Sequence, residues 1–196
     1  YGNRILPATA GRTTMCPTEL LYEAGKPSAI ELLPIETRST NASVAEFKRF
    51  PEEWRVVELD TASAEAMHAA LSRVGEQKLV SQELAAKLGF AIDAEGKSGL
   101  KPDAGGLVEI PCWRHAVINF PHPLLEQGLV ILDTPGLNAI GAEPELTLSQ
   151  LPNAHAILFI LAADTGVTQS DLAVWRDHVN GARTRQKGRI AVLNRI

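Results

Sequence analysis

The feature that most constrains the fold is an uninterrupted apolar run at residues 129–132, followed directly by Asp133-Thr134-Pro135-Gly136. Because the run does not alternate with polar residues, it predicts a central strand covered on both faces. In open α/β sheets, ligands bind at the carboxyl ends of the strands. An aspartate there can hold Mg²⁺ through water, and a glycine lets a backbone N–H approach a phosphate oxygen. The motif favours a phosphate and magnesium site over the alternative, a Pro-Gly turn after a buried strand.

Two further apolar runs, at residues 156–161 and 189–193, predict buried strands with a helix between them at residues 169–179. Thr168 is a suitable N-cap for this helix, with Asp171 three residues further on. Strand, helix and strand joined by short links form a βαβ unit, so the strands are expected to be parallel. We expect all three apolar strands to be neighbours in one sheet, with Asp133 and Asn194 at the same edge.

The rest of the chain is less regular, and its 196 residues are about the size of one domain. Half-exposed strands are predicted at residues 29–33 and 114–120, and a short helix at 144–151. Met67, Leu71 and Val74 have the spacing of one helix face. A second helix is predicted at 82–88, ending at Gly89, and a loop at 93–106. These features indicate an insertion that carries helices at about residues 37–106.

Composition argues against several other classes of protein. The net charge is −4 and charges of both signs are scattered, which argues against a nucleic-acid-binding face. The two cysteines lie far apart, which suggests free thiols in a reducing compartment. The five histidines form no ligand pair at helical spacing, so no metal cluster is predicted. No apolar run reaches the roughly 18 residues of a membrane span, and no signal peptide is predicted.

Two weaker signals accompany the Asp-Thr-Pro-Gly motif. Residues 6–17 (LPATAGRTTMCP) form a small-residue loop that enters a strand, and its hydroxyl and backbone groups could close over a phosphate and its metal. A surface turn explains that loop equally well. Asn194 follows an apolar strand, where its amide could bind a base edge, although asparagine is also a common turn former.

Together these segments resemble the GTPase domain of bacterial dynamin-like proteins. Residues 127–138 (QGLVILDTPGLN) are similar to switch II, residues 6–17 to switch I, and residues 162–171 (AADTGVTQSD) to the segment after the fourth strand. The resemblance implies an α/β fold of the P-loop GTPase type, with three layers and a mostly parallel central sheet. Residues 1–196 would then be a partial dynamin-type GTPase domain, incomplete and with a helical insertion.

The same resemblance assigns roles to five residues. Thr14 would contact Mg²⁺ and the terminal phosphate, and Asp133 would hold Mg²⁺ through water. Gly136 would give its N–H to the terminal phosphate, Gly11 would let the switch loop lie against the nucleotide, and Asn194 would bind guanine. Thr14 and Gly136 are therefore the candidate catalytic residues, Mg²⁺ is the expected cofactor and GTP the expected substrate.

The resemblance also implies a biological setting. It indicates a bacterial, cytoplasmic protein, peripheral at the inner membrane, that remodels membranes. Its GTPase domain would self-associate, its membrane contact would come from parts outside this chain, and nucleic acid is not an expected partner.

The chain departs from the family pattern at both ends. The G-x-x-x-x-G-K-[ST] loop would belong just before Tyr1, and the aspartate that selects guanine would follow Ile196. We therefore expect residues 1–196 alone not to bind or hydrolyse GTP. We also expect residues 7–14 and 137–143 to lack a fixed position without the terminal phosphate and Mg²⁺.

Three alternatives remain open from the sequence. One is another P-loop GTPase, associated with the ribosome or translation, whose Asp-Thr-Pro-Gly would look the same. Another is a non-catalytic GTPase-like scaffold that only mediates assembly. The third is an α/β domain that binds no nucleotide.

Overall fold

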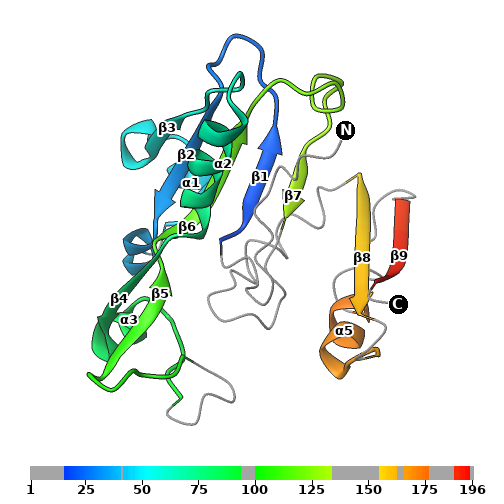
Figure 1. The fold of residues 1–196 in the computed structure, drawn as a ribbon. Coiled ribbons are helices and arrows are strands. Elements are labelled where there is room, and N and C mark those ends of the chain that lie inside the picture. The colour runs from blue at the N-terminus through cyan, green and yellow to red at the C-terminus, as the bar shows by residue number, and fades with distance from the viewer. Residues whose placement is uncertain are drawn as a thin grey trace. The chain divides into compact units, whose positions relative to one another are not determined.

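Two separate units make up the chain, Tyr1–Glu143 and Pro144–Ile196. The computed structural model describes residues 16–40, 42–93, 100–133, 155–162, 166–176 and 188–194. Figure 1 shows the described elements in chain order, from β1 near the N-terminus to β9 near the C-terminus.

The first unit is built on a five-stranded sheet with the order β3-β2-β6-β1-β7. Only the β1–β6 pair is parallel, and the other three neighbouring pairs are antiparallel. The predicted parallel character is therefore only partial in this unit, because β2, β3 and β7 run antiparallel to the strands beside them. The strands are β1 (Thr18–Leu21), β2 (Ala29–Pro34), β3 (Arg55–Glu58), β6 (Trp113–Asn119) and β7 (Ile131–Asp133).

One face of this sheet packs against helix α2 (Ala64–Ser72) and the 3-10 turn η3 (Arg73–Gly75). The predicted helix face is confirmed, because Leu71 and Val74 are buried in this core and Met67 packs against it. The Ser63 side chain accepts a hydrogen bond from the Ala66 N–H and caps the helix. The sheet residues of the same core are Leu20, Ile30, Leu32, Ala116 and Ile118.

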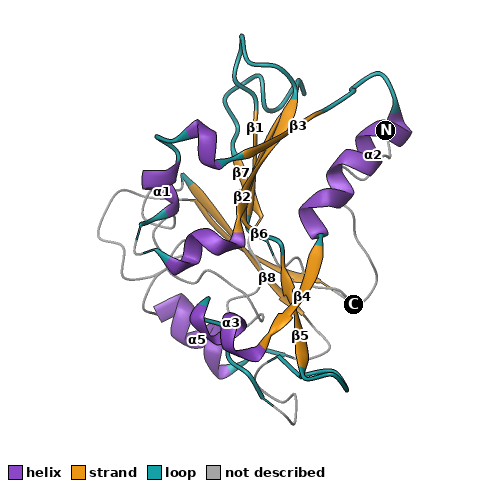
Figure 2. Cartoon of the chain, turned by 90° about the vertical axis from the view of Figure 1, so that its left-hand side faces the viewer, coloured by secondary structure: helices purple, strands orange, loops and turns teal. Residues whose placement is uncertain are grey.

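The other face carries the short helix α1 (Val44–Phe47), as Figure 2 shows by placing α1 and α2 on opposite sides of the sheet. Ser43 and Glu46 form a capping box that starts this helix. The indole N–H of Trp54 donates to the Phe47 carbonyl over 2.9 Å. Two 3-10 turns, η1 (Ile35–Ser39) and η2 (Pro51–Glu53), complete this layer.

A small lobe extends from the sheet and has its own core. Strands β4 (Gln77–Ser81) and β5 (Leu107–Pro111) pair in antiparallel fashion beside helix α3 (Gln82–Lys87). Its core includes Val80, Ala85, Val108 and Ile110. The helix ends before Gly89, whose φ of 82° suits glycine. Residues 37–106 thus contain two strands, β3 and β4, besides the predicted helices, and residues 94–99 of the predicted loop lie outside the described residues.

Burial differs from the sequence-based expectation in three strands. β2 and β6 were predicted to be half-exposed, but they are interior strands, and Ile30, Leu32 and Ile118 are 0% exposed. β7 was predicted to be central and covered, yet it ends the described strand order, and Val130 before it is 56% exposed. An apolar run shows that a strand prefers burial, but not which neighbours it finds.

The second unit forms the predicted βαβ arrangement. β8 (Ala156–Ala162) and β9 (Gly188–Asn194) pair in parallel, and α5 (Gln169–Val174) lies between them in sequence. Thr168 and Asp171 form the predicted capping box, and the rings of Phe159 and Trp175 meet edge to face at 5.6 Å. The predicted helix at 144–151 and residues 177–179 of the predicted 169–179 helix lie outside the described residues. Within the described parts of the chain, no helix is long and apolar enough to cross a membrane.

Candidate functional site

Antiparallel pairing of β1 and β7 sets the geometry around Asp133. Thr18 begins β1 and lies opposite Asp133, which ends β7. The chain therefore enters β1 at the same end of the sheet at which it leaves β7. Asp133 is half-buried there, and the predicted position of this aspartate at a strand's carboxyl end is confirmed.

Thr18 is fixed at the start of β1. It is 0% exposed, and its hydroxyl donates to the Cys16 carbonyl over 3.0 Å. The partner position of Asp133 is therefore a buried, hydrogen-bonded residue and not a loop. This pair sets where the end of β7 lies along β1.

The other predicted site residues are not brought together by the described structure. Gly11, Thr14 and Gly136 lie outside the described residues, as do residues 7–14 and 137–143, which the sequence assigned to the switches. Asn194 ends β9 in the second unit, opposite Ala162, which ends β8. Its predicted place at a strand's carboxyl end is confirmed, whereas its shared edge with Asp133 stays a prediction.

The Asp133 carboxylate suits magnesium by its chemistry. Mg²⁺ prefers oxygen ligands and keeps several waters, so one carboxylate acting through water is enough for a substrate-bound ion. The structure shows no group of three or more His, Cys, Asp or Glu side chains able to hold a metal within the ranges that it describes.

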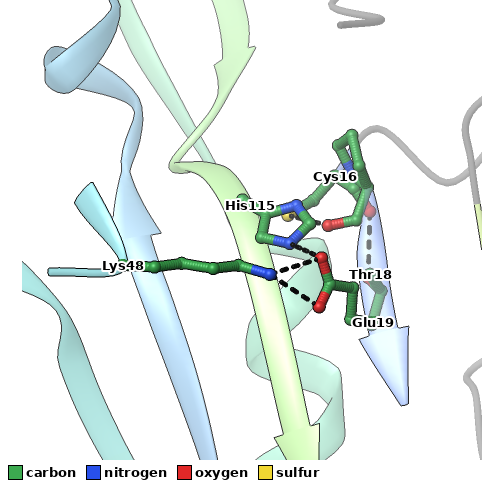
Figure 3. Close-up of polar contacts among 6 residues, drawn as sticks. Cys16, Thr18, Glu19, Lys48 and His115 are labelled. Atoms are coloured by element: carbon green, nitrogen blue, oxygen red, sulfur yellow. Dashed lines mark hydrogen bonds and ion pairs between the residues drawn. The ribbon is translucent and has the colours of Figure 1, made fainter. Parts of the chain in front are cut away.

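A buried charge cluster lies beside this end of the sheet, and sequence reasoning missed it. The Glu19 carboxylate of β1 accepts hydrogen bonds from the Lys48 ammonium at 2.7 and 2.8 Å. Nε2 of His115, from β6, lies 3.2 Å from the same carboxylate. Figure 3 shows the three side chains converging from three separate segments. The Glu19 side chain is 11% exposed, His115 0% and Lys48 42%.

The cluster keeps Glu19 ionised. Burial raises the pKa of its carboxyl, but the hydrogen bonds from His115 and Lys48, with their electrostatic attraction, outweigh burial and lower the pKa from 4.5 to about 2. A buried carboxylate is stable only with such partners, because desolvation otherwise disfavours the charged form. Glu19 therefore depends on residues that lie far from it in the sequence.

In the described structure, the His115 ring is hydrogen-bonded through Nε2 and not through Nδ1. An ionised carboxylate can only accept, so Nε2 must donate to Glu19, which leaves Nδ1 as an acceptor in the neutral ring. This buried Nδ1 has no hydrogen-bond partner in the structure described. The ring also meets Trp54 edge to face at a centroid distance of 6.2 Å. The bond to Glu19 is thus the ring's polar anchor.

A partial signal for this cluster was present in the sequence. Glu19 directly precedes the apolar pair Leu20-Leu21, and His115 directly precedes the apolar run at residues 116–118. Ionisable residues in such segments are rarely buried without a partner. Lys48 gave no signal, because its partner lies 29 residues away in sequence and only the packing of α1 brings it there. Beside the cluster is a surface cavity of about 410 Å³, lined by Glu19, Leu21, Glu23, Lys26, Glu31, Lys48, Pro51, Trp54 and Val117.

A mixed α/β architecture, an acidic residue at a strand's carboxyl end and a βαβ unit are typical of the α/β nucleotide-binding proteins. The family model described as the dynamin family matches residues 1–196, the whole length of this chain. The chain therefore belongs to the dynamin family, and its resemblance to a dynamin-type GTPase domain is confirmed.

One relative is similar to part of this chain. A bacterial dynamin-like protein of Nostoc punctiforme (strain ATCC 29133 / PCC 73102) is 37% identical over 67 residues. The matched stretch covers 34% of this chain and 10% of that protein. The chain thus aligns with only a small part of the relative's length.

Proposed function

We propose that the full-length protein carrying this chain binds and hydrolyses GTP with Mg²⁺. The observation that carries the proposal is the Thr18–Asp133 pair at one end of the sheet, in a chain of the dynamin family. Thr14 precedes Thr18 by four positions in the sequence. Family membership favours this reading over a ribosome-associated GTPase, although the Asp-Thr-Pro-Gly motif alone fits both.

The proposed roles of the chain's residues follow from phosphoryl transfer, which needs positioning and charge neutralisation more than covalent chemistry. Asp133 orients water bound to the metal, and Thr14 contributes a hydroxyl when its loop closes. The Gly136 N–H donates to the terminal phosphate, and Gly11 lets the loop approach without a side chain in the way. Asn194 donates to and accepts from the guanine edge. Bound Mg²⁺ supplies charge neutralisation on the phosphates.

Self-association and membrane remodelling are the wider function that we propose. GTPase domains that pair across the nucleotide would complete the site, because pairing can order loops that one copy leaves open. We propose that membrane contact comes from parts of the protein outside residues 1–196, and that the protein works in the cytoplasm, peripheral at the inner membrane. Sedimentation with anionic lipid vesicles, with and without GTP, tests this wider proposal. Failure to co-sediment in either state would reject it.

Titration of a fluorescent GTP analogue and phosphate release, both on the full-length protein, test the proposed catalysis. Asp133→Ala is expected to lower Mg²⁺-dependent hydrolysis by about 10²-fold or more, as for loss of one preorganised electrostatic group. Thr14→Ala should lower kcat more than nucleotide affinity, because its contact forms mainly on closure. Asp103→Ala, in the β4–β5 lobe, is the matched control for loss of a carboxylate.

Three outcomes would reject specific parts of this proposal. Unchanged hydrolysis in both Asp133→Ala and Thr14→Ala would show that these residues lack the assigned roles. Nucleotide binding without any hydrolysis in the wild-type protein would favour the non-catalytic scaffold. Micromolar binding of the analogue by residues 1–196 alone would show that the nucleotide site has been misplaced.

A further inference from the structure

β7, the strand that ends at Asp133, is short. β7 has three residues and pairs with β1 through three residue pairs, namely Thr18 with Asp133, Glu19 with Leu132 and Leu20 with Ile131. β1 is its hydrogen-bonded neighbour among the described strands. The position of β1 in the sheet therefore bears directly on the position of Asp133.

β1 is itself a short strand. It has four residues, and its parallel pairing with β6 runs from Thr18–Ala116 to Leu21–Asn119. The pairing begins at Thr18, the residue that lies opposite Asp133. The buried Leu20 favours one register, and side-chain contacts on the other face of β1 can add to this preference.

The Glu19 cluster lies at this point. Glu19 is opposite Val117 on β6, and His115 is two residues before Val117, so both side chains share one face of the sheet. Glu19 is also opposite Leu132 on β7, one residue before Asp133. The hydrogen bond from His115 to Glu19 is therefore a diagonal link between β6 and β1 beside the β1–β7 pairs.

We propose that Glu19, His115 and Lys48 are positioning residues that lock β1 in register and thereby hold the Asp133 end of β7 in the geometry that the proposed GTP hydrolysis requires. This inference rests on the proposed function for its catalytic consequence. Its structural part concerns the β1–β7 pair alone.

The physical reason is the free-energy cost of leaving a buried carboxylate with too few hydrogen-bond partners. Any shift of β1 along β6 moves the Glu19 carboxylate away from Nε2 of His115 and from Lys48. The carboxylate would then stay buried with fewer partners, and such a loss is strongly destabilising. The His115 ring would also lose its hydrogen bond to Glu19, and its Nδ1 has no partner in the described structure that could compensate. One register of β1 is therefore strongly preferred.

Lys48 connects a third segment of the chain to the Glu19–His115 pair. It follows α1 directly and contacts both carboxylate oxygens, so it ties this helix to β1 across the sheet face. Trp54 lies in the same layer. Its ring packs on His115, and its indole N–H donates to the Phe47 carbonyl of α1. The network thus joins β1, β6 and α1, three elements that are far apart in the sequence.

Lys48→Met is the most informative variant for the test, because a 42% exposed side chain can be replaced without opening the core. Lys48→Arg keeps a donor for both carboxylate oxygens and serves as the conservative rescue. Lys78→Met is the matched control, since Lys78 also pairs with a glutamate, Glu36, but lies in the β4–β5 lobe. Glu19→Gln is a second variant that removes the charge with little change in shape.

The first readout is amide hydrogen exchange of a peptide covering β7 in the full-length protein without nucleotide. We expect exchange about tenfold faster in Lys48→Met and in Glu19→Gln, a change that corresponds to about 1.4 kcal/mol. Lys48→Arg and the control Lys78→Met should exchange as the wild type does. Equal exchange in Lys48→Met and Lys78→Met would overturn the positioning role.

The second readout separates positioning from general stability. In GTP hydrolysis with saturating Mg²⁺, Lys48→Met should lower kcat about tenfold with KM changed less than twofold, and Lys48→Arg should restore kcat. Unchanged kcat with faster β7 exchange would overturn the catalytic consequence. A wild-type protein that hydrolyses no GTP rejects the proposed function instead, and in that case the exchange readout still decides the structural part.

Discussion

Acid pH is expected to remove the stability that Glu19 contributes, and the variant Glu19→Gln isolates this contribution. The pKa of its carboxyl is lowered from 4.5 to about 2 in the folded protein. A carboxyl whose folded-state pKa is depressed contributes stability that is present above the unfolded-state pKa and is lost as the pH falls towards the folded-state value. The window for this group therefore runs from about pH 5 down to about pH 2.

The magnitude follows from the size of the shift. At about 1.36 kcal/mol per pKa unit, the lowering corresponds to about 3 kcal/mol at neutral pH. About 2 kcal/mol of this is lost by about pH 3, because the unfolded chain is protonated there while the folded carboxyl is only partly so. The side chain is 11% exposed, so solvent screening reduces this value little.

The assay is urea unfolding of the full-length wild type and Glu19→Gln at a series of pH values, followed by tryptophan fluorescence. Trp54 packs on His115, so its emission reports on this cluster. The difference in unfolding free energy should be largest above about pH 5 and shrink by about 2 kcal/mol towards about pH 3.

Glu23→Gln is the matched control for this assay. Glu23 pairs with Lys26 at the surface with a 55% exposed side chain, and the pair should contribute under about 1 kcal/mol. A wild-type minus Glu19→Gln difference that stays constant across the pH series would refute the reasoning, because the carboxylate would then not be held ionised by its partners.

Two further predictions concern the layers on either side of the sheet. Leu71→Ala should lower the free energy of unfolding in urea by about 2–5 kcal/mol, because Leu71 is 3% exposed in the α2 core. The control Leu84→Ala should lower it by less than about 1 kcal/mol, because Leu84 is 39% exposed. Equal losses in the two variants would contradict this difference in burial. Ser43→Ala should cost about 1 kcal/mol by removing the capping box of α1, and Ser39→Ala, an exposed serine bonded to the Glu36 carbonyl, should cost less. An unaffected Ser43→Ala would show that the box does not stabilise α1.

Local signals in the sequence determined much of the secondary structure. The capping pair Thr168 and Asp171, the helix face of Leu71 and Val74, and the stop at Gly89 each depend on neighbours within a few residues. The position of Asp133 at a strand end was predictable for the same reason, because an apolar run ended by a polar turn is a local pattern.

The sequence by itself therefore determined part of the secondary structure, including the strands that carry Asp133 and Asn194 and the places of these two residues at the strand ends. It did not indicate β3, β4, β5 or α1. Only the tertiary structure decided the sheet order, the antiparallel β1–β7 pair and the Glu19 cluster. Strand pairing and buried ion pairs join residues as far apart as Glu19 and His115, which are separated by 96 positions. Local preference does not encode such partners, because they are selected by how whole elements pack and by the need to pair every buried charge.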